Sequence, residues 1–148
     1  MTTIVNNRKA RHDYEIINSI ETGIVLLGTE VKSLRDGKAN ITDAYARIKD
    51  NELWLISLHI SAYVKSAVTN HDPLRDRKLL VNKLELKKLR RQIEEKGVTL
   101  IPLKLYFKNH LVKVEIALAR GKKKYDKRAA IAERDMKRDL ERNNKIKY

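Results

Sequence analysis

Apolar residues recur at every second position in several short stretches of this chain, which is the spacing of β-strands with one buried face. The first such stretch runs from Tyr14 to Ile20. A turn at Thr22-Gly23 and a second apolar run, Ile24 to Leu27, follow it. Residues 1–12 are polar and basic and carry no strand pattern. We therefore expect the strands to begin with a hairpin at Tyr14.

A second hairpin is predicted in the middle of the chain. Apolar and polar residues alternate from Ala44 to Lys49, and after a turn at Asp50-Asn51 they alternate again from Trp54 to Ser61. The apolar series of this second strand is Trp54, Ile56, Leu58 and Ile60. The polar segment Ser66 to Asp76 then breaks the pattern, so we expect a long loop there.

Two helices are expected from their capping residues. The first spans Glu30 to Arg35, and Gly37 just beyond it fits a helix C-cap. In the second helix Asn82 and Glu85 form a pair like a capping box, and Gly97 ends the helix. Its buried stripe is Leu86, Leu89 and Ile93.

Two further strands complete the folded part, Leu100 to Lys108 and Leu111 to Ala119, with a turn at Asn109-His110. About six strands in mostly sequence-adjacent antiparallel pairs, with a helix inserted among them, indicate a small antiparallel barrel. The connections are too short for repeated βαβ crossovers. We expect a mainly β, six-stranded barrel with two or three accessory helices. An oligonucleotide-binding type of barrel (OB-fold) fits this pattern, and so do other small barrels.

The character of the sequence changes at residues 119–128, which read ARGKKKYDKR. We expect one folded domain over residues 1–120 and a basic tail over residues 121–148, because the tail has no proline, no strand pattern and few large apolar side chains. Drawn as a helix, the tail has cations on one face, namely Lys127, Arg134, Arg138, Arg142 and Lys145. Its opposite face is mostly alanine, so we expect the tail to be frayed when free and helical when bound.

Charge gives the strongest indication of function. Lys and Arg number 33 against 19 Asp and Glu, a net charge of +14, and the stretch from Arg120 to Tyr148 carries +7 of it, with twelve basic and five acidic residues. A polyanion is therefore the expected partner, and the lack of a long apolar run favours nucleic acid over a membrane. The alternative is dispersed charge that only aids solubility. The chain has no cysteine, which excludes disulfides and Cys-ligated zinc, and with no secretory signal we expect a cytoplasmic protein.

Candidate catalytic residues are few. The four histidines lie far apart, and no glycine-rich phosphate loop or nucleophile elbow occurs. The one constellation to weigh is a metal-dependent nuclease built on Glu30 and Lys32 with Asp13 or Asp43, since such enzymes hold a cation with two or three carboxylates. Glu30 and Lys32 are expected to point to different faces of their helix, which argues against it. We expect no catalytic residue, metal or cofactor.

Basic residues form three clusters that make one positive surface if the strand ends meet. They are Arg8, Lys9, Arg11 and His12 before the first strand; Arg75, Arg77 and Lys78 beside the long loop; and Lys113, Arg120, Lys122 and Lys123 in and after the last strand. Four aromatic residues could stack on bases, but we expect them to be core or barrel-edge residues. They are Tyr14, Tyr45, Trp54 and Tyr106.

Four ordered stretches of the sequence together resemble one family. They are NRKARHDYEI at residues 7–16, GTEVKSLRDGKANITDAY at 28–45, HDPLRDRKLL at 71–80, and PLKLYFKN through ALARGKKKYDKR at 102–128. Together they are similar to the small protein B family, the SsrA-binding or transfer-messenger-RNA-binding proteins. The resemblance implies an OB-type barrel, the rescue of stalled bacterial ribosomes by trans-translation, and no catalysis. Implied partners are transfer-messenger RNA (tmRNA), the ribosome and, through the RNA complex, elongation factor Tu; we expect a monomer and no membrane contact.

The same resemblance implies which residues act. The barrel would grip the tRNA-like part of tmRNA through Asn7, His12, Glu21, Leu80, Asn82 and Lys113, with added charge from Arg8, Arg120, Lys122 and Lys123. Glu21 is a carboxylate, so we expect it to accept hydrogen bonds from base or ribose groups instead of meeting phosphate. Leu80 as a barrel contact and Asn82 as a helix cap also have purely structural explanations.

The tail would occupy the decoding centre and the empty message channel of the ribosome. The positions implied there are Asp126, Lys127 and Arg128, followed by the basic stripe with Arg134 and Arg138. Residues 142–148 match none of the motifs on which the resemblance rests, so no contact is assigned to them. The alternatives to this function are a general ribosome-associated RNA-binding barrel or RNA chaperone, and the metal-dependent nuclease.

Overall fold

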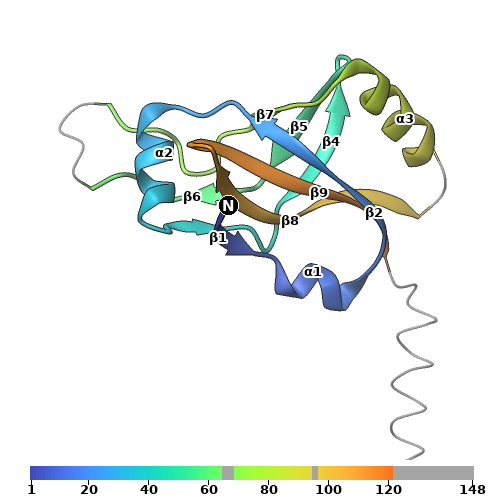
Figure 1. Ribbon diagram of the computed structural model, residues 1–148, viewed down its shortest axis with the longest axis horizontal. Coiled ribbons are helices and arrows are strands. Elements are labelled where there is room, and N and C mark those ends of the chain that lie inside the picture. Colours follow the sequence, from blue (N-terminus) through green and yellow to red (C-terminus); the bar gives the residue numbers. More distant parts are fainter. Residues whose placement is uncertain (65–68, 95–96, 122–148) are drawn as a thin grey trace, which may run out of the picture.

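A closed ring of six antiparallel strands forms the body of the protein in the computed structural model, which describes residues 1–64, 69–94 and 97–121 (Figure 1). In ring order the strands are β8 (Val98–Lys108), β4 (Tyr45–Lys49), β5 (Glu52–Ile56), β7 (Arg77–Leu80), β2 (Tyr14–Ile24) and β9 (Leu111–Gly121), and β9 pairs again with β8. The prediction of a mainly β, six-stranded antiparallel barrel is confirmed. The predicted tail helix lies outside the described residues.

Three helices and three short strands surround the ring. Strand β1 (Thr2–Asn6) pairs with β8, and β3 (Ala39–Asn40) pairs with β6 (His59–Ile60). The helices are α1 (Arg8–Asp13), α2 (Gly28–Arg35) and α3 (Lys83–Ile93). Figure 1 shows α2 and α3 at opposite ends of the barrel and α1 beneath it, beside the end of β9. Both predicted helices are therefore present, and α1 is additional.

Strand β2 corrects the first predicted hairpin. It runs without a turn through Thr22-Gly23, pairing with β9 from Tyr14 to Gly23 and with β7 at Gly23 and Ile24. A Cβ added at Gly23 would lie 3.2 Å from the Cβ of Leu80. The glycine therefore allows a close approach of β7, a known use of glycine inside a strand, and does not mark a turn.

The other two predicted turns are confirmed. Asp50 and Asn51 join β4 to β5, and Asn109 and His110 join β8 to β9, all four with φ between 50° and 66°. Positive φ at both central residues is the geometry of two-residue hairpin turns that match the twist of the strands. Short-range sequence signals were sufficient here because the turn is set by two residues alone.

The second strand of the middle hairpin differs from prediction in which residues it buries. Leu53 and Leu55 are almost fully buried, whereas Trp54 and Ile56 are only half-buried. Ser57 then takes a φ of 61°, which breaks the strand and reverses its alternation. As a result Leu58 and Ile60 return to the core. A single irregular residue thus shifted the period-two pattern by one position.

The core lies on both sides of the β8–β9 wall. Inside the ring, Val112, Val114, Ile116 and Leu118 pack with the leucines of β5, β7 and β8, as their alternation predicted. On the outer side, Ala117 and Ala119 form a second cluster with Ala10 of α1, Ile101 and Leu103. Because both β9 residues there are alanines, α1 can lie close against the sheet.

Candidate nucleic-acid interface

The C-terminal part of β2 brings together three of the residues expected to grip RNA. Gly23 is paired with Leu80 of β7 on one side and with Lys113 of β9 on the other. Glu21 lies two residues before Gly23 and so shares its outward face. Leu80 is 52% exposed and Glu21 is exposed as well. An acid, a base and an apolar side chain from three strands therefore meet on the outside of the barrel.

A hydrogen-bonded cluster surrounds Glu21 on this face. The hydroxyl of Tyr106 donates to Glu21 Oε2 at 2.5 Å, and Lys108 Nζ lies 3.3 Å from both carboxylate oxygens. The Tyr106 hydrogen bond, supported by the charges of Lys108 and Lys113, holds the pKa of Glu21 below its ordinary value. Lys104 Nζ lies 5.1 Å from the centre of the Tyr106 ring, within range of a cation–π contact.

We call this set the outer strip: Glu21, Leu80, Lys104, Tyr106, Lys108 and Lys113. Glu21 is an ionised acceptor framed by three lysines. Such a site can accept a hydrogen bond from a base or ribose while the lysines neutralise phosphates beside it. The arrangement fits selective contact with RNA better than general charge attraction.

Helix α1 extends the basic surface along β9. Arg8 and His12 are exposed on it, and His12 Nδ1 lies 3.0 Å from Asp13. Arg11 reaches Glu115 of β9 at 3.8 Å, which places α1 next to the outer strip. The predicted N-terminal cluster and Lys113 are thus brought to one side of the barrel.

Arg120 lies at the end of β9 and approaches Glu15 of β2 at 4.0 Å. It is half-buried there, one residue before the end of the strand. The remaining predicted positions, Lys122, Lys123, Asp126, Lys127, Arg128, Arg134 and Arg138, lie outside the described residues. Their roles stay predictions.

Asn7 is placed differently from an RNA-contacting residue. It is only 3% exposed, and its amide is bonded inward: Oδ1 accepts from the Ala10 N–H at 3.1 Å, and Nδ2 donates to the Pro102 carbonyl at 2.9 Å. Asn7 is the N-cap of α1 and ties the helix to β8. The geometry therefore gives Asn7 a part in positioning α1, which carries Arg8 and His12. Direct contact of Asn7 with RNA stays a prediction.

Asn82 caps α3 as the sequence predicted, with Oδ1 accepting from the backbone N–H groups of Leu84 and Glu85 at 2.9 and 3.1 Å. It is nevertheless exposed and stands two residues after Leu80, so both of its predicted roles are compatible with the structure.

Substitution at Asn82 separates the two roles. Asn82→Asp keeps the capping oxygen but adds a negative charge, so we expect normal stability with weaker RNA binding. Asn82→Ala should cost about 1 kcal/mol of stability through loss of the cap. Urea unfolding and RNA titration of the two variants provide the measurement. Unchanged RNA affinity in Asn82→Asp would leave Asn82 a cap only.

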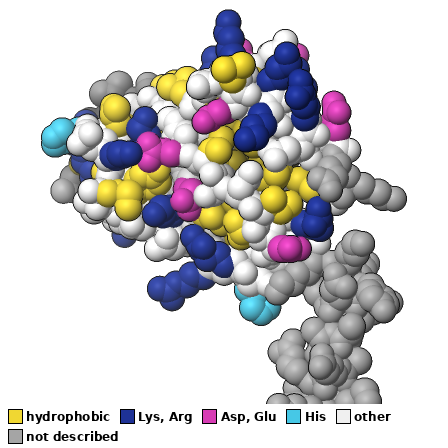
Figure 2. Space-filling model, turned by 45° about the vertical axis from the view of Figure 1, so that its right-hand side comes forward, with side chains coloured by type: hydrophobic (Ala, Val, Ile, Leu, Met, Phe, Trp, Pro, Cys, Tyr) yellow, Lys and Arg dark blue, Asp and Glu magenta, His cyan; other side chains and the backbone are white. Residues whose placement is uncertain are grey.

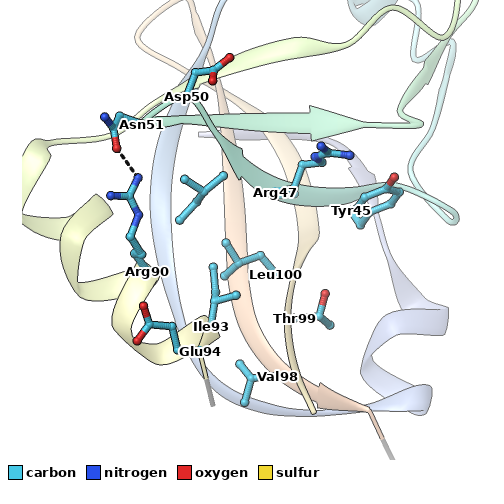
Figure 3. A pocket seen from close by; sticks show the side chains of 12 residues that line it. Tyr45, Arg47, Asp50, Asn51, Arg90, Ile93, Glu94, Val98, Thr99 and Leu100 are labelled. Atoms are coloured by element: carbon cyan, nitrogen blue, oxygen red, sulfur yellow. Dashed lines mark hydrogen bonds between the residues drawn. The ribbon is translucent and has the colours of Figure 1, made fainter. Parts of the chain in front are cut away.

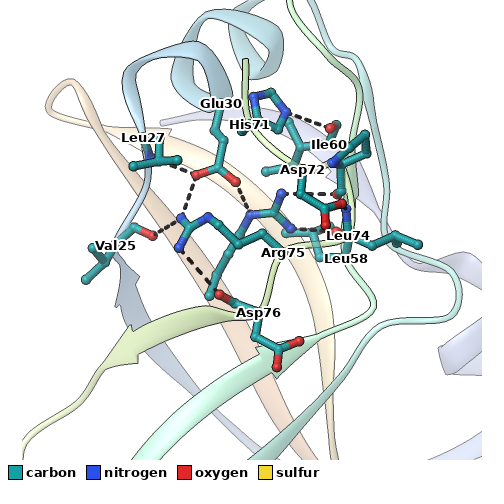
Figure 4. Close-up of polar contacts among 12 residues, drawn as sticks. Val25, Leu27, Glu30, Leu58, Ile60, His71, Asp72, Leu74, Arg75 and Asp76 are labelled. Carbon is teal, nitrogen blue, oxygen red and sulfur yellow. Dashed lines mark hydrogen bonds and ion pairs between the residues drawn. The ribbon is translucent and has the colours of Figure 1, made fainter. Parts of the chain in front are cut away.

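The cluster beside the long loop is not a surface cation patch, which corrects the prediction for Arg75 and Arg77. Arg77 is fully buried and paired with Glu30, and Arg75 Nη2 donates to Glu30 Oε1 at 2.6 Å (Figure 4). Arg77 also donates to the Leu58 carbonyl at 2.5 Å and to the Pro73 carbonyl at 3.1 Å. The two arginines fasten the loop to α2. Arg77 is not available to phosphates, and Arg75, whose side chain is 31% exposed, is held by Glu30.

The same network argues against a metal-dependent nuclease site built on Glu30 and Lys32. Glu30 is fully buried and neutralised by arginines, while Lys32 points outward to the ring of Tyr63, its Nζ 5.6 Å from the ring centre. The described residues contain no group of three or more acidic or histidine side chains able to hold a metal ion. The expectation that Glu30 and Lys32 face apart is confirmed. None of the helices in the described part of the chain is long and apolar enough to span a bilayer.

The surface is mixed in charge over the face that Figure 2 draws. Figure 2 shows Lys and Arg side chains interspersed with Asp and Glu and with apolar patches over one face of the molecule. A groove of about 630 Å³ lies between the β4–β5 hairpin, α3 and β8, where Arg90 donates to Asn51 at 2.5 Å (Figure 3). Its rim carries Arg47 and Arg90 against Asp50 and Glu94. This balance gives the groove no preference for a polyanion.

The sequence analysis weighed Tyr106 only as an aromatic residue that could stack on a base, and it did not connect Tyr106, Lys104 or Lys108 with Glu21. The signal was present in PLKLYFKN, where these three residues alternate with Leu103, Leu105 and Phe107 and so share one face of β8. The sequence did not show that Tyr106 bonds to Glu21 across the sheet, because the two residues are 85 positions apart.

The fold and the outer strip define a small OB-like barrel with charged and apolar side chains on the outer face of β2, β7, β8 and β9. The SmpB protein family model matches residues 4–146, and this chain belongs to that family. It is 54% identical over 144 residues to an SsrA-binding protein of Treponema denticola, covering 97% of this chain and 94% of that protein. An SsrA-binding protein of Staphylococcus aureus is 53% identical over 146 residues, covering 99% and 95%.

A solved structure described as "tmRNA-SmpB: a journey to the center of the bacterial ribosome" is similar in fold and sequence. Its TM-score is 0.68 at 53% identity, covering 81% of this chain and 85% of that chain.

Proposed function

We propose that this protein binds the tRNA-like domain of tmRNA and delivers it to stalled ribosomes for trans-translation. The observation that carries the proposal is the near-full-length match to SsrA-binding proteins, together with the likeness to a tmRNA–SmpB structure from the ribosome. The outer strip supports it independently, because it offers an ionised acceptor among lysines on an exposed barrel face. The protein then acts as a binding factor and not as an enzyme, in the cytoplasm where ribosomes work.

The barrel and the tail divide the task. In this proposal Lys113 and the cations of α1 neutralise phosphates of the RNA, Glu21 accepts from a base or ribose donor, and Leu80 gives an apolar contact. The tail, with Asp126, Lys127, Arg128, Arg134 and Arg138, meets ribosomal RNA in the decoding centre and message channel. A tail with a net charge of +6, from eleven basic and five acidic residues, is suited to an RNA-lined path.

Recovery of RNA bound to the protein from cells, followed by sequencing, tests the proposal. We expect tmRNA to be strongly enriched over transfer and messenger RNA. Enrichment of mixed RNA without tmRNA would instead support the general RNA-binding barrel or chaperone. Degradation of labelled RNA by pure protein with magnesium would support a nuclease.

The salt dependence of binding tests the lysines. Lys113→Ala with Lys123→Ala should weaken binding to a tRNA-like tmRNA fragment and lower the slope of log affinity against log salt by up to about two, if each lysine neutralises one phosphate. The matched control is Lys49→Ala with Lys88→Ala, which removes the same charge from β4 and α3, outside the outer strip. Equal slopes for both double variants would exclude Lys113 and Lys123 from the interface.

A further inference from the structure

We propose that Tyr106 is a positioning residue for RNA recognition: its hydroxyl holds the Glu21 carboxylate so that the other carboxylate oxygen, Oε1, is presented to an N–H or 2′-OH donor of the RNA. This inference rests on the proposed function and adds to it the residue that makes Glu21 selective. Tyr106 does not contact the RNA in this view; it acts through Glu21.

The Tyr106 side chain is well placed to fix another group. It is 3% exposed on β8, and its neighbours across the sheet are Thr3 of β1 and Lys113 of β9. A ring held on both sides by strands has few accessible rotamers, so its hydroxyl occupies one position. From there it donates to Glu21 Oε2 at 2.5 Å, spanning β9 to reach β2.

Within the described part of the chain, only Tyr106 distinguishes the two oxygens of Glu21. Lys108 Nζ lies 3.3 Å from Oε1 and 3.3 Å from Oε2, so it attracts the carboxylate without selecting an orientation. Among the described residues, Oε2 accepts from both Tyr106 and Lys108, whereas Oε1 accepts from Lys108 alone. The Glu21 side chain is 39% exposed. Oε1 therefore keeps acceptor capacity, because an ionised carboxylate oxygen takes more than one hydrogen bond.

The ionisation of both partners agrees with this geometry. The Tyr106 hydrogen bond lowers the pKa of Glu21, and burial with the same bond raises the pKa of Tyr106, so the proton stays on the phenol and the charge stays on the carboxylate. The charged groups facing the pair are Lys104 and Lys108 of β8 and Lys113 and Glu115 of β9. Without the phenol, these lysines would be free to draw the carboxylate toward themselves and away from the RNA.

Tyr106→Phe tests the proposal, because it removes one hydroxyl and keeps the ring. We expect binding of the tRNA-like tmRNA fragment to weaken about tenfold, the scale of a charge-assisted hydrogen bond, while binding of an unrelated duplex RNA is unchanged. Glu21→Gln should show the same selective loss, and the double variant should bind no more weakly than Glu21→Gln alone. The matched control is Tyr45→Phe, which removes a hydroxyl from an exposed tyrosine on β4 and should bind like the wild type.

A carbon-13 titration of the Glu21 carboxyl supplies a readout that a purely structural role would not move. In Tyr106→Phe the pKa of Glu21 should rise, since the largest influence lowering it is gone. An unchanged Glu21 titration, additive losses in the double variant, or equal loss on the duplex RNA would each overturn the role of Tyr106. If the wild-type protein does not prefer the tRNA-like RNA, the proposed function is disproved instead. The wild type is therefore measured before the variants.

Discussion

Deletion of residues 122–148 should abolish ribosome rescue while leaving a folded barrel that still binds tmRNA. The described core needs nothing from the deleted segment: the ring closes through β8 and β9, and both hydrophobic clusters lie before Gly121. The melting temperature should therefore change little. The deleted segment carries eleven Lys and Arg against five Asp and Glu, so affinity for the RNA should fall modestly through lost long-range attraction. Calorimetry, RNA titration and an in vitro tagging assay measure the three effects.

Point substitutions then test which tail residues act. Lys127→Ala with Arg128→Ala should be as defective in rescue as the change of Asp126, Lys127 and Arg128 together, with nearly normal RNA binding. Asp126→Asn is the control, because it keeps an oxygen able to cap a helix and loses only charge. Full rescue by the double variant would exclude these two cations from ribosome contact. Arg134, Arg138 and Arg142 would then be the remaining candidates.

The parts of the fold that the sequence predicted well are those fixed by neighbouring residues. Asp50-Asn51 and Asn109-His110 form the expected turns, and Asn82 caps the expected helix. The prediction failed where a distant strand decides. Gly23 was interpreted as part of a turn, whereas the structure uses a glycine there to let Leu80, 57 residues later, approach closely. Strand β1 was not predicted because its partner, β8, begins only at Val98.

The candidate site divides in the same way. The family resemblance led to Glu21, Leu80 and Lys113, which the barrel brings together on adjacent strands. The prediction from charge alone placed Arg77 on the surface, because a cation beside a loop is usually solvated. Its buried partner, Glu30, lies 47 residues earlier in the sequence. The histidine of the same motif, HDPLRDRKLL, also has a structural role. His71 Nδ1 lies 2.8 Å from the Thr29 hydroxyl, and its Nε2 lies 2.8 Å from the Ile60 carbonyl oxygen.

Glu30→Gln should cause the largest loss of stability among single substitutions in the barrel, roughly 3 to 5 kcal/mol. Glu30 and Arg77 are both fully buried, so removing the carboxylate charge leaves a guanidinium in the interior without its counter-ion (Figure 4). The glutamine has nearly the same shape, so the loss reports charge and not a cavity. Urea unfolding at pH 7 measures it. A loss below about 1 kcal/mol would mean that water reaches Arg77 freely.

Two further measurements identify the cause. Burial raises the pKa of Glu30, but hydrogen bonds from Arg75, the Leu27 N–H and Arg77 outweigh it, so the pKa lies below its ordinary value. A lowered pKa in the folded state stabilises the protein above the unfolded-state pKa of about 4.3, and this stabilisation disappears as the pH falls through the folded-state pKa. The difference between wild type and Glu30→Gln should thus be constant from pH 7 to 5 and shrink below about pH 4.

The double variant Glu30→Gln with Arg77→Met is the control for an unpaired charge. It removes the stranded guanidinium but leaves the carbonyls of Leu58 and Pro73 without their donor, so it should recover part of the stability and not all of it. If the double variant is less stable than Glu30→Gln, Arg77 contributes mainly through those carbonyls. At a temperature where Glu30→Gln is fully folded, its affinity for the tRNA-like RNA should match the wild type, because no residue of this network belongs to the outer strip.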